Sequence, residues 1–126
     1  MPNTRTIDRR REVRIPINIE LLVWGVDIKG ERFLQEACAR DISLSGALLS
    51  GLDADLRSGD VIGILYEGRK ARYRVVWIRY DEGGDKMQVA VHRVDPDVCP
   101  WQHLLAQSVV RGQESVVSGC GQAFVN

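Results

Sequence analysis

Apolar and polar residues alternate in short segments over the first ninety residues, and this pattern predicts β-strands rather than helices. Six segments have strand character: 15–24, 31–42, 46–49, 61–66, 69–80 and 86–93. Glycine and acidic residues lie between most of them, as is typical of turns, and 53–60 has the composition of a longer loop. Several short strands joined by turns, without a long helical period, predict an all-β fold, either a barrel or a sandwich.

Segment 69–80, one of the two longest, also predicts the face on which each of its side chains lies. Alternation gives one face Ala71, Tyr73, Val75 and Trp77, and the other Arg72, Arg74, Val76 and Ile78. With Arg69 and Lys70, the two arginines form a basic group, which we interpret as a solvated strand face or, alternatively, as an extension of a ligand site. The three tryptophans are expected in the core or at the barrel cap: Trp24, Trp77 and Trp101.

The pattern becomes helical after Cys99. Five residues recur at the spacing of one helix face: Trp101, Leu104, Leu105, Ser108 and Val109. Pro100 suits the first turn, and Gly112 predicts the end of the helix, which we expect to pack on the barrel. The predicted organisation is a flexible arginine-rich leader (1–14), a barrel with its C-terminal helix (15–111) and a flexible tail (112–126).

Composition narrows the possible classes of function. The 126 residues correspond to one domain, with 44% hydrophobic and 27% charged residues, as in ordinary globular proteins. Seventeen residues of each charge sign give a net charge of zero, which argues against binding to a nucleic acid polymer. Three cysteines without CxxC spacing and two histidines do not make a metal set. No signal peptide or membrane-spanning segment is recognisable, so we expect a cytoplasmic protein.

Positive charge gathers in the leader, where all of it comes from arginine. Five arginines against two acidic residues give residues 1–14 a net charge of +3. The planar guanidinium group suits bidentate contact with phosphate or with a guanine edge, whereas a tail that only needs solubility would accept lysine equally well. The alternative is a solvated basic terminus that contacts nothing. This stretch by itself leaves both interpretations open.

A second informative stretch, Asp41-Ile42-Ser43-Leu44-Ser45-Gly46, lies between two predicted strands, in a loop or bulge. The Asp41 carboxylate can accept hydrogen bonds from the ring N–H and amino group of guanine, and the Ser43 hydroxyl can donate or accept beside it. Gly46 permits a close approach of the backbone. The same residue types also form an ordinary Asx or Ser turn, which is the alternative interpretation.

Together the two stretches resemble the PilZ family, which is marked by RxxxR before a small β-barrel and by [D/N]xSxxG on a following strand. Both motifs are complete here, the first as Arg10 to Arg14 and the second as Asp41 to Gly46. Arg5 and Arg9 also fit RxxxR but lie further from the first strand. The flanking residues 15–17 and 75–77 are similar to the barrel strands of the family, and the resemblance covers residues 9–93.

The resemblance implies a six-stranded antiparallel β-barrel with a C-terminal α-helix that binds cyclic di-GMP, a bacterial second messenger. The residues themselves show no arrangement for catalysis, and we expect no enzyme activity, no cofactor and no metal. Arg10 and Arg14 would grip guanine edges and phosphates, with Arg11 stacking on a base or contacting a phosphate. Asp41 and Ser43 would fix one guanine, and Gly46 would act through its backbone.

The position of the arginines suggests how such a receptor would signal. Ligand binding would fold the leader onto the outer face of the barrel and so present a changed surface to a downstream protein partner. One alternative is a PilZ-like adaptor that binds proteins but no nucleotide. Another is a small barrel that binds RNA or DNA, against which the zero net charge argues.

Overall fold

The structure, a computed structural model, describes residues 13–83 and 86–111, with side chains as far as residue 107. The expectations for Arg10, Arg11, the leader and the tail 112–126 therefore lie outside the described residues. The elements are β1 (Arg14–Val26), β2 (Arg32–Ser43), β3 (Gly46–Leu52), β4 (Val61–Tyr66), β5 (Arg69–Tyr80), β6 (Met87–Arg93) and α2 (Gln102–Arg111). All six strands and the helix coincide with segments that the hydrophobic pattern predicts.

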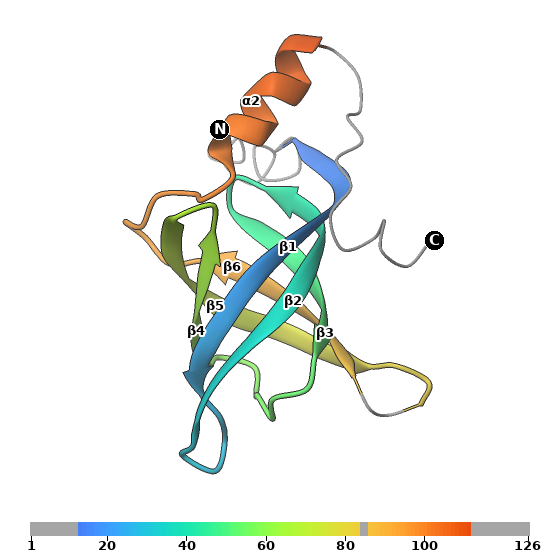
Figure 1. Cartoon of the computed structure of the whole chain (residues 1–126), viewed down its shortest axis with the longest axis vertical. Coiled ribbons are helices and arrows are strands. Elements are labelled where there is room, and N and C mark those ends of the chain that lie inside the picture. Colours follow the sequence, from blue (N-terminus) through green and yellow to red (C-terminus); the bar gives the residue numbers. More distant parts are fainter. Residues whose placement is uncertain (1–12, 84–85, 112–126) are drawn as a thin grey trace, which may run out of the picture.

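The strands form a closed barrel in the order β1-β2-β3-β6-β5-β4, and every neighbouring pair is antiparallel. The predicted six-stranded antiparallel barrel is thereby confirmed. Closure pairs the edges of the first and fourth strands through Leu22, Val23 and Trp24 on β1. Figure 1 shows the barrel with α2 lying beyond one of its ends. No helix in the described ranges is long and apolar enough to cross a membrane.

The core fills the inside of the barrel with alternate side chains from every strand. Val23, Leu49, Ile64, Tyr73 and Val89 are completely buried, each from a different strand. Trp101, which immediately precedes α2, is also completely buried, and its ring lies 5.5 Å from that of Tyr73. The segment leading into α2 thus closes one end of the barrel with an aromatic plug.

Side-chain contacts also tie α2 to the tight turn between β4 and β5. His103 stacks on Tyr66, with ring centroids 6.1 Å apart, and its Nε2 lies 3.3 Å from the carboxylate of Glu67. Arg69 approaches the other ring nitrogen of His103 at 3.4 Å. Arg69 therefore belongs to the helix attachment rather than to a continuous basic strand face.

The prediction for Trp77 was wrong, and a β-bulge gives the physical reason. Ala71, Tyr73 and Val75 point inward as expected, but the pairing of β5 with β6 shifts between Val75 and Trp77. The inserted residue, Val76, reverses the alternation, so Trp77 lies on the outer surface and is 40% exposed. Trp24 lies half-buried on the outer face of β1, where its indole covers Gly63. Of the three tryptophans, Trp101 is the one in the core.

Candidate ligand-binding groove

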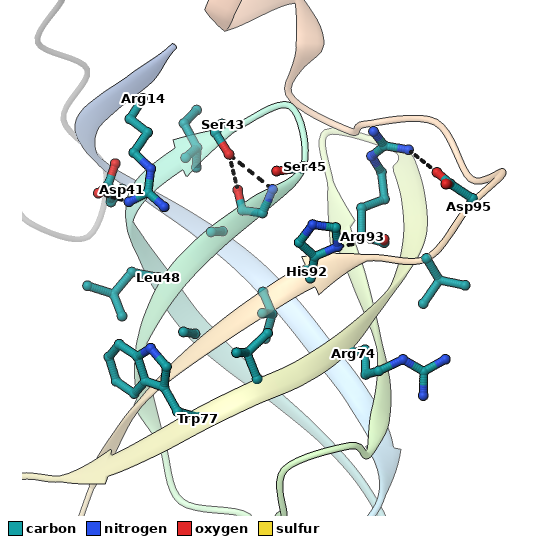
Figure 2. A pocket seen from close by; sticks show the side chains of 17 residues that line it. Arg14, Asp41, Ser43, Ser45, Leu48, Arg74, Trp77, His92, Arg93 and Asp95 are labelled. Atoms are coloured by element: carbon teal, nitrogen blue, oxygen red, sulfur yellow. Dashed lines mark hydrogen bonds and ion pairs between the residues drawn. The ribbon is translucent and has the colours of Figure 1, made fainter. Parts of the chain in front are cut away.

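An open groove of about 1170 Å³ lies on the outer face of the barrel, over β2, β3, β6 and β5. We call it the outer groove (Figure 2). The lining residues labelled in the figure are Arg14, Asp41, Ser43, Ser45, Leu48, Arg74, Trp77, His92, Arg93 and Asp95. Pockets for drug-sized ligands typically measure roughly 300–1,000 Å³, so a larger ligand with several polar groups has room here.

Strand register arranges the floor of the groove in two rows of neighbouring residues. One row runs across four strands through Asp41, Leu48, Ala90 and Trp77, which are successive register partners. The second row runs from Gly46 on β3 through His92 on β6 to Arg74 on β5. On the β1 side, Arg14 is the partner of Ser43 and so stands beside the end of this second row. The groove thus combines a mostly apolar and aromatic row, which ends in the Asp41 carboxylate, with a polar, cationic one.

A bulge in β2 brings Asp41 to this surface. Ala37 and Ala39 point into the core, and simple alternation would send Asp41 inward after them. The pairing of β2 with β3 shifts between Ala39 and Asp41, so Asp41 turns to the groove and Ile42 takes the buried position. The expectation that this motif lies in a loop or bulge is confirmed. Two bulges, one in β2 and one in β5, therefore deliver Asp41 and Trp77 to the same row.

Arg14 and Asp41 form an ion pair at the edge of the groove. Their Nη1 and Oδ2 atoms lie 3.8 Å apart, and the two side chains are 71% and 33% exposed. Partial burial raises the pKa of Asp41, and the nearby Arg14 guanidinium opposes that rise. A pair this open and this long is worth about 1 kcal/mol or less. Arg14 can therefore exchange this contact for an anionic ligand at small cost.

Ser43 and Gly46 shape the turn between β2 and β3. The Gly46 N–H donates to Ser43 Oγ at 3.1 Å, and the Ser43 side chain is buried. This is the hydrogen-bonded turn that we considered as the alternative interpretation of the motif. A Cβ atom added to Gly46 would lie 2.5 Å from the carbonyl oxygen of Val91, so β3 approaches β6 closely because this residue has no side chain. The close backbone approach that we expected Gly46 to permit is therefore present, and its role toward a ligand stays a prediction.

The carbonyl group of Ser43 links the groove to the helix. It accepts a hydrogen bond from the Trp101 indole N–H at 2.9 Å, and the Cys99 thiol lies 3.9 Å away. Both donors belong to the segment that leads into α2. The turn that carries the second motif is therefore fixed on one side to the plug at the end of the barrel.

The wall of the groove beyond His92 is built by Arg93, which the sequence analysis did not single out. Its guanidinium donates to the carbonyl oxygens of Leu44 at 2.9 Å and Asp97 at 2.7 Å, and it pairs with Asp95 at 3.3 Å. Its backbone N–H donates to the carbonyl of Ser45. Arg93 thus holds the β2–β3 turn against the segment after β6. Nothing in the local spacing of residues signals this role.

Three arginines of the basic group on β5 lie in three different surroundings: Arg69, Arg72 and Arg74. Arg74 lines the outer groove, where its Nη1 donates to the Gly59 carbonyl at 3.2 Å. Arg72 instead forms a two-point contact with Asp97, at 3.0 and 3.1 Å, outside that groove. Hydrogen bonds from Arg72 lower the pKa of Asp97. Arg74 therefore fits the alternative of an extended ligand site, whereas Arg69 and Arg72 serve structural contacts.

Four of the six predicted site residues lie together in the outer groove: Arg14, Asp41, Ser43 and Gly46. Arg10 and Arg11 lie outside the described residues. Residues that line the groove without having been predicted to do so include Trp77, His92 and Arg93. Within residues 13–83 and 86–111, no cluster of three His, Cys, Asp or Glu side chains is placed to hold a metal ion.

Comparison with known proteins identifies the family. The model of the PilZ domain matches residues 8–109, so the chain belongs to the PilZ domain family. This family consists of receptor modules for cyclic di-GMP rather than enzymes. None of the curated proteins that were compared matches the chain.

Two solved structures show the same fold. The Bacillus subtilis inhibitor of motility MotI/DgrA has a TM-score of 0.58 at 17% identity, and the match covers 82% of this chain and 50% of that one. MrkH of K. pneumonia in its apo state has a TM-score of 0.53 at 13% identity, with 80% and 53% covered. The chain therefore spans about half the length of each of these proteins.

Proposed function

We propose that this protein is a receptor that binds cyclic di-GMP in the outer groove. The observation that carries the proposal is the convergence of Arg14, Asp41 and the exposed Trp77 on one groove, from three strands that are distant in sequence. The ligand offers two phosphates and two guanines. A guanidinium, a carboxylate and an indole ring match, in turn, a phosphate or guanine acceptor edge, a guanine donor edge and a base face.

In this proposal the Asp41 carboxylate accepts from the ring N–H and amino group of one guanine. Arg14 leaves its long contact with Asp41 and contacts phosphate or the guanine O6 and N7 atoms, together with Arg10 and, as a helper, Arg11. Trp77 lies in the same row as Asp41, across Leu48 and Ala90, and offers its ring to a guanine face.

Ser43 and Gly46 serve this site in different ways. The Ser43 hydroxyl fixes the turn that presents Asp41, and it contacts the guanine only by exchanging its hydrogen bond with Gly46. Gly46 keeps β3 close to β6, so that the rows of the groove stay in register.

Two parts of the protein report ligand binding to a partner, namely the leader and α2. Binding folds the leader onto the ligand, since Arg10 and Arg11 lie within four residues of Arg14. The carbonyl of Ser43 transmits any shift of the β2–β3 turn to Trp101 and hence to α2. A downstream protein that reads the leader or the helix surface then distinguishes the free receptor from the bound one.

Calorimetric titration of cyclic di-GMP into the full chain tests this function. We expect Arg14→Ala and Asp41→Ala each to weaken binding by roughly tenfold to a hundredfold, because each charge-assisted contact contributes about 1.5–3 kcal/mol. Arg32→Ala is the matched control, since Arg32 is an exposed arginine at the opposite end of β2 and does not line the groove.

Absence of binding by the wild-type chain, or an equal loss in Arg32→Ala, would overturn the proposal. The first result would favour the adaptor alternative. No feature of the described residues favours the adaptor alternative, because the groove is open rather than filled by a side chain.

A further inference from the structure

His92 occupies a central position in the groove that neither motif includes. It lies on the outer side of β6, exposed, with Gly46 as its register partner on β3 and Arg74 on β5. Gly46 has no side chain, so the flank of the ring toward β3 is uncovered. Figure 2 shows the imidazole beside the β2–β3 turn, within the groove.

The hydrogen bond of His92 fixes which ring nitrogen can gain a proton. Its Nδ1 lies 3.3 Å from the carbonyl oxygen of Arg93. A carbonyl oxygen can only accept, so Nδ1 carries a hydrogen and Nε2 is the nitrogen that is protonated in acid. Protonation therefore converts Nε2 from an acceptor, which repels phosphate oxygens, into a donor that attracts them.

The charged side chains near His92 are held by contacts with other groups. Arg74 faces it from β5, with one guanidinium nitrogen bound to the Gly59 carbonyl. On β6 itself the Arg93 guanidinium turns away to carbonyl groups and to Asp95. From β1 and β2, Arg14 and Asp41 face each other at the other end of the groove.

We propose that protonated His92 contacts a phosphate of cyclic di-GMP in the outer groove, so that the receptor binds the dinucleotide more tightly as the pH falls. This inference rests on the proposed function. Its sign follows from linkage: an anionic ligand stabilises the imidazolium, so binding is stronger in acid than in base.

The effect is modest because the site is open to solvent. A single charge a few ångströms from a phosphate, with water nearby, strengthens binding by roughly threefold to tenfold. Protonation of Asp41, whose pKa is raised by burial, acts in the opposite direction at the acidic end. The comparison must therefore be made between variants at each pH.

The test is calorimetric titration of cyclic di-GMP at pH 5.5, 6.5, 7.5 and 8.5 and constant ionic strength. The wild-type chain is compared with His92→Gln, which keeps a polar side chain but does not titrate. His103→Gln is the matched control, because His103 lies on α2 and contacts Glu67 rather than the groove. We expect the wild type and His103→Gln to gain threefold to tenfold in affinity toward acid, relative to His92→Gln.

Equal pH dependence in the wild type and His92→Gln would overturn this inference while leaving the receptor function intact. Absence of dinucleotide binding at every pH would overturn both. The two failures are therefore distinguishable in one set of titrations.

Discussion

The close approach of β3 to β6 at Gly46 makes Gly46→Ala a demanding test of the groove architecture. The added Cβ would lie 2.5 Å from the Val91 carbonyl oxygen. Carbon and oxygen atoms in such contacts are normally at least about 3.3 Å apart, so the strands would have to separate by roughly 0.8 Å. The backbone fixes the position of the Cβ atom, and the Val91 oxygen is itself a backbone atom, so no side-chain rotation relieves the overlap. A separation of that size takes ladder hydrogen bonds beyond their normal length.

The expected cost combines overpacking with one or two weakened hydrogen bonds. We estimate a loss of about 2–4 kcal/mol in the free energy of unfolding, which for a domain of this size lowers Tm by roughly 10–20 °C. Urea titration and thermal melting followed by circular dichroism measure both quantities. Gly83→Ala is the matched control, since a Cβ there would meet no atom within 4 Å, and we expect a change within about 0.5 kcal/mol. A Gly46→Ala protein as stable as the control would refute the reasoning.

The remaining predictions concern the helix link, the aromatic row and an exposed ion pair. Trp101→Phe deprives the Ser43 carbonyl of its indole donor and should reduce stability by about 1–3 kcal/mol in urea titrations; Trp77→Phe, the same change on the surface, should leave stability nearly unchanged. Trp77→Ala should weaken cyclic di-GMP binding by about tenfold or more through lost stacking, and unchanged affinity in calorimetry would exclude a base on that ring. Arg72 lowers the pKa of Asp97, so this carboxylate stabilises the fold above its ordinary pKa and loses that contribution as the pH falls. Asp97→Asn should therefore show a shallower loss of Tm below pH 5 than the wild type, and parallel curves would contradict this.

The strands and the helix were predictable because hydrophobic periodicity and turn residues agree over nearly the whole barrel. The short turn at Glu67 and Gly68 and the helix after Pro100 are local features of this kind. The meeting of Arg14 with Asp41 was predicted from the motif pair alone, and the register of β1 on β2 supplies it. For these features, the structure that the local sequence favours is also the one that the folded protein adopts.

The part of the groove that β5 and β6 form was not predictable, because it depends on strand register and on bulges. Alternation along β5 places Trp77 with Tyr73, and the extra residue that reverses it has no signal in the sequence of that strand. His92 lies beside Gly46 through the pairing of β6 with β3, two strands about forty residues apart in the sequence. Arg74 reaches the groove through the pairing of β5 with β6. Arg93 acts through hydrogen bonds to carbonyl groups, which any residue supplies. Such contacts leave no pattern for a sequence analysis to find.

The most direct test of the central claim is a map of the binding surface by NMR. Cyclic di-GMP is titrated into isotope-labelled protein, and the shifts of the backbone amides are followed. The account predicts that the described amides with the largest shifts belong to 41–46, 74–77 and 90–93, the segments that form the outer groove. Shifts concentrated instead around Trp24 and Val98, which line a separate pocket, or no shifts at saturating ligand, would contradict it.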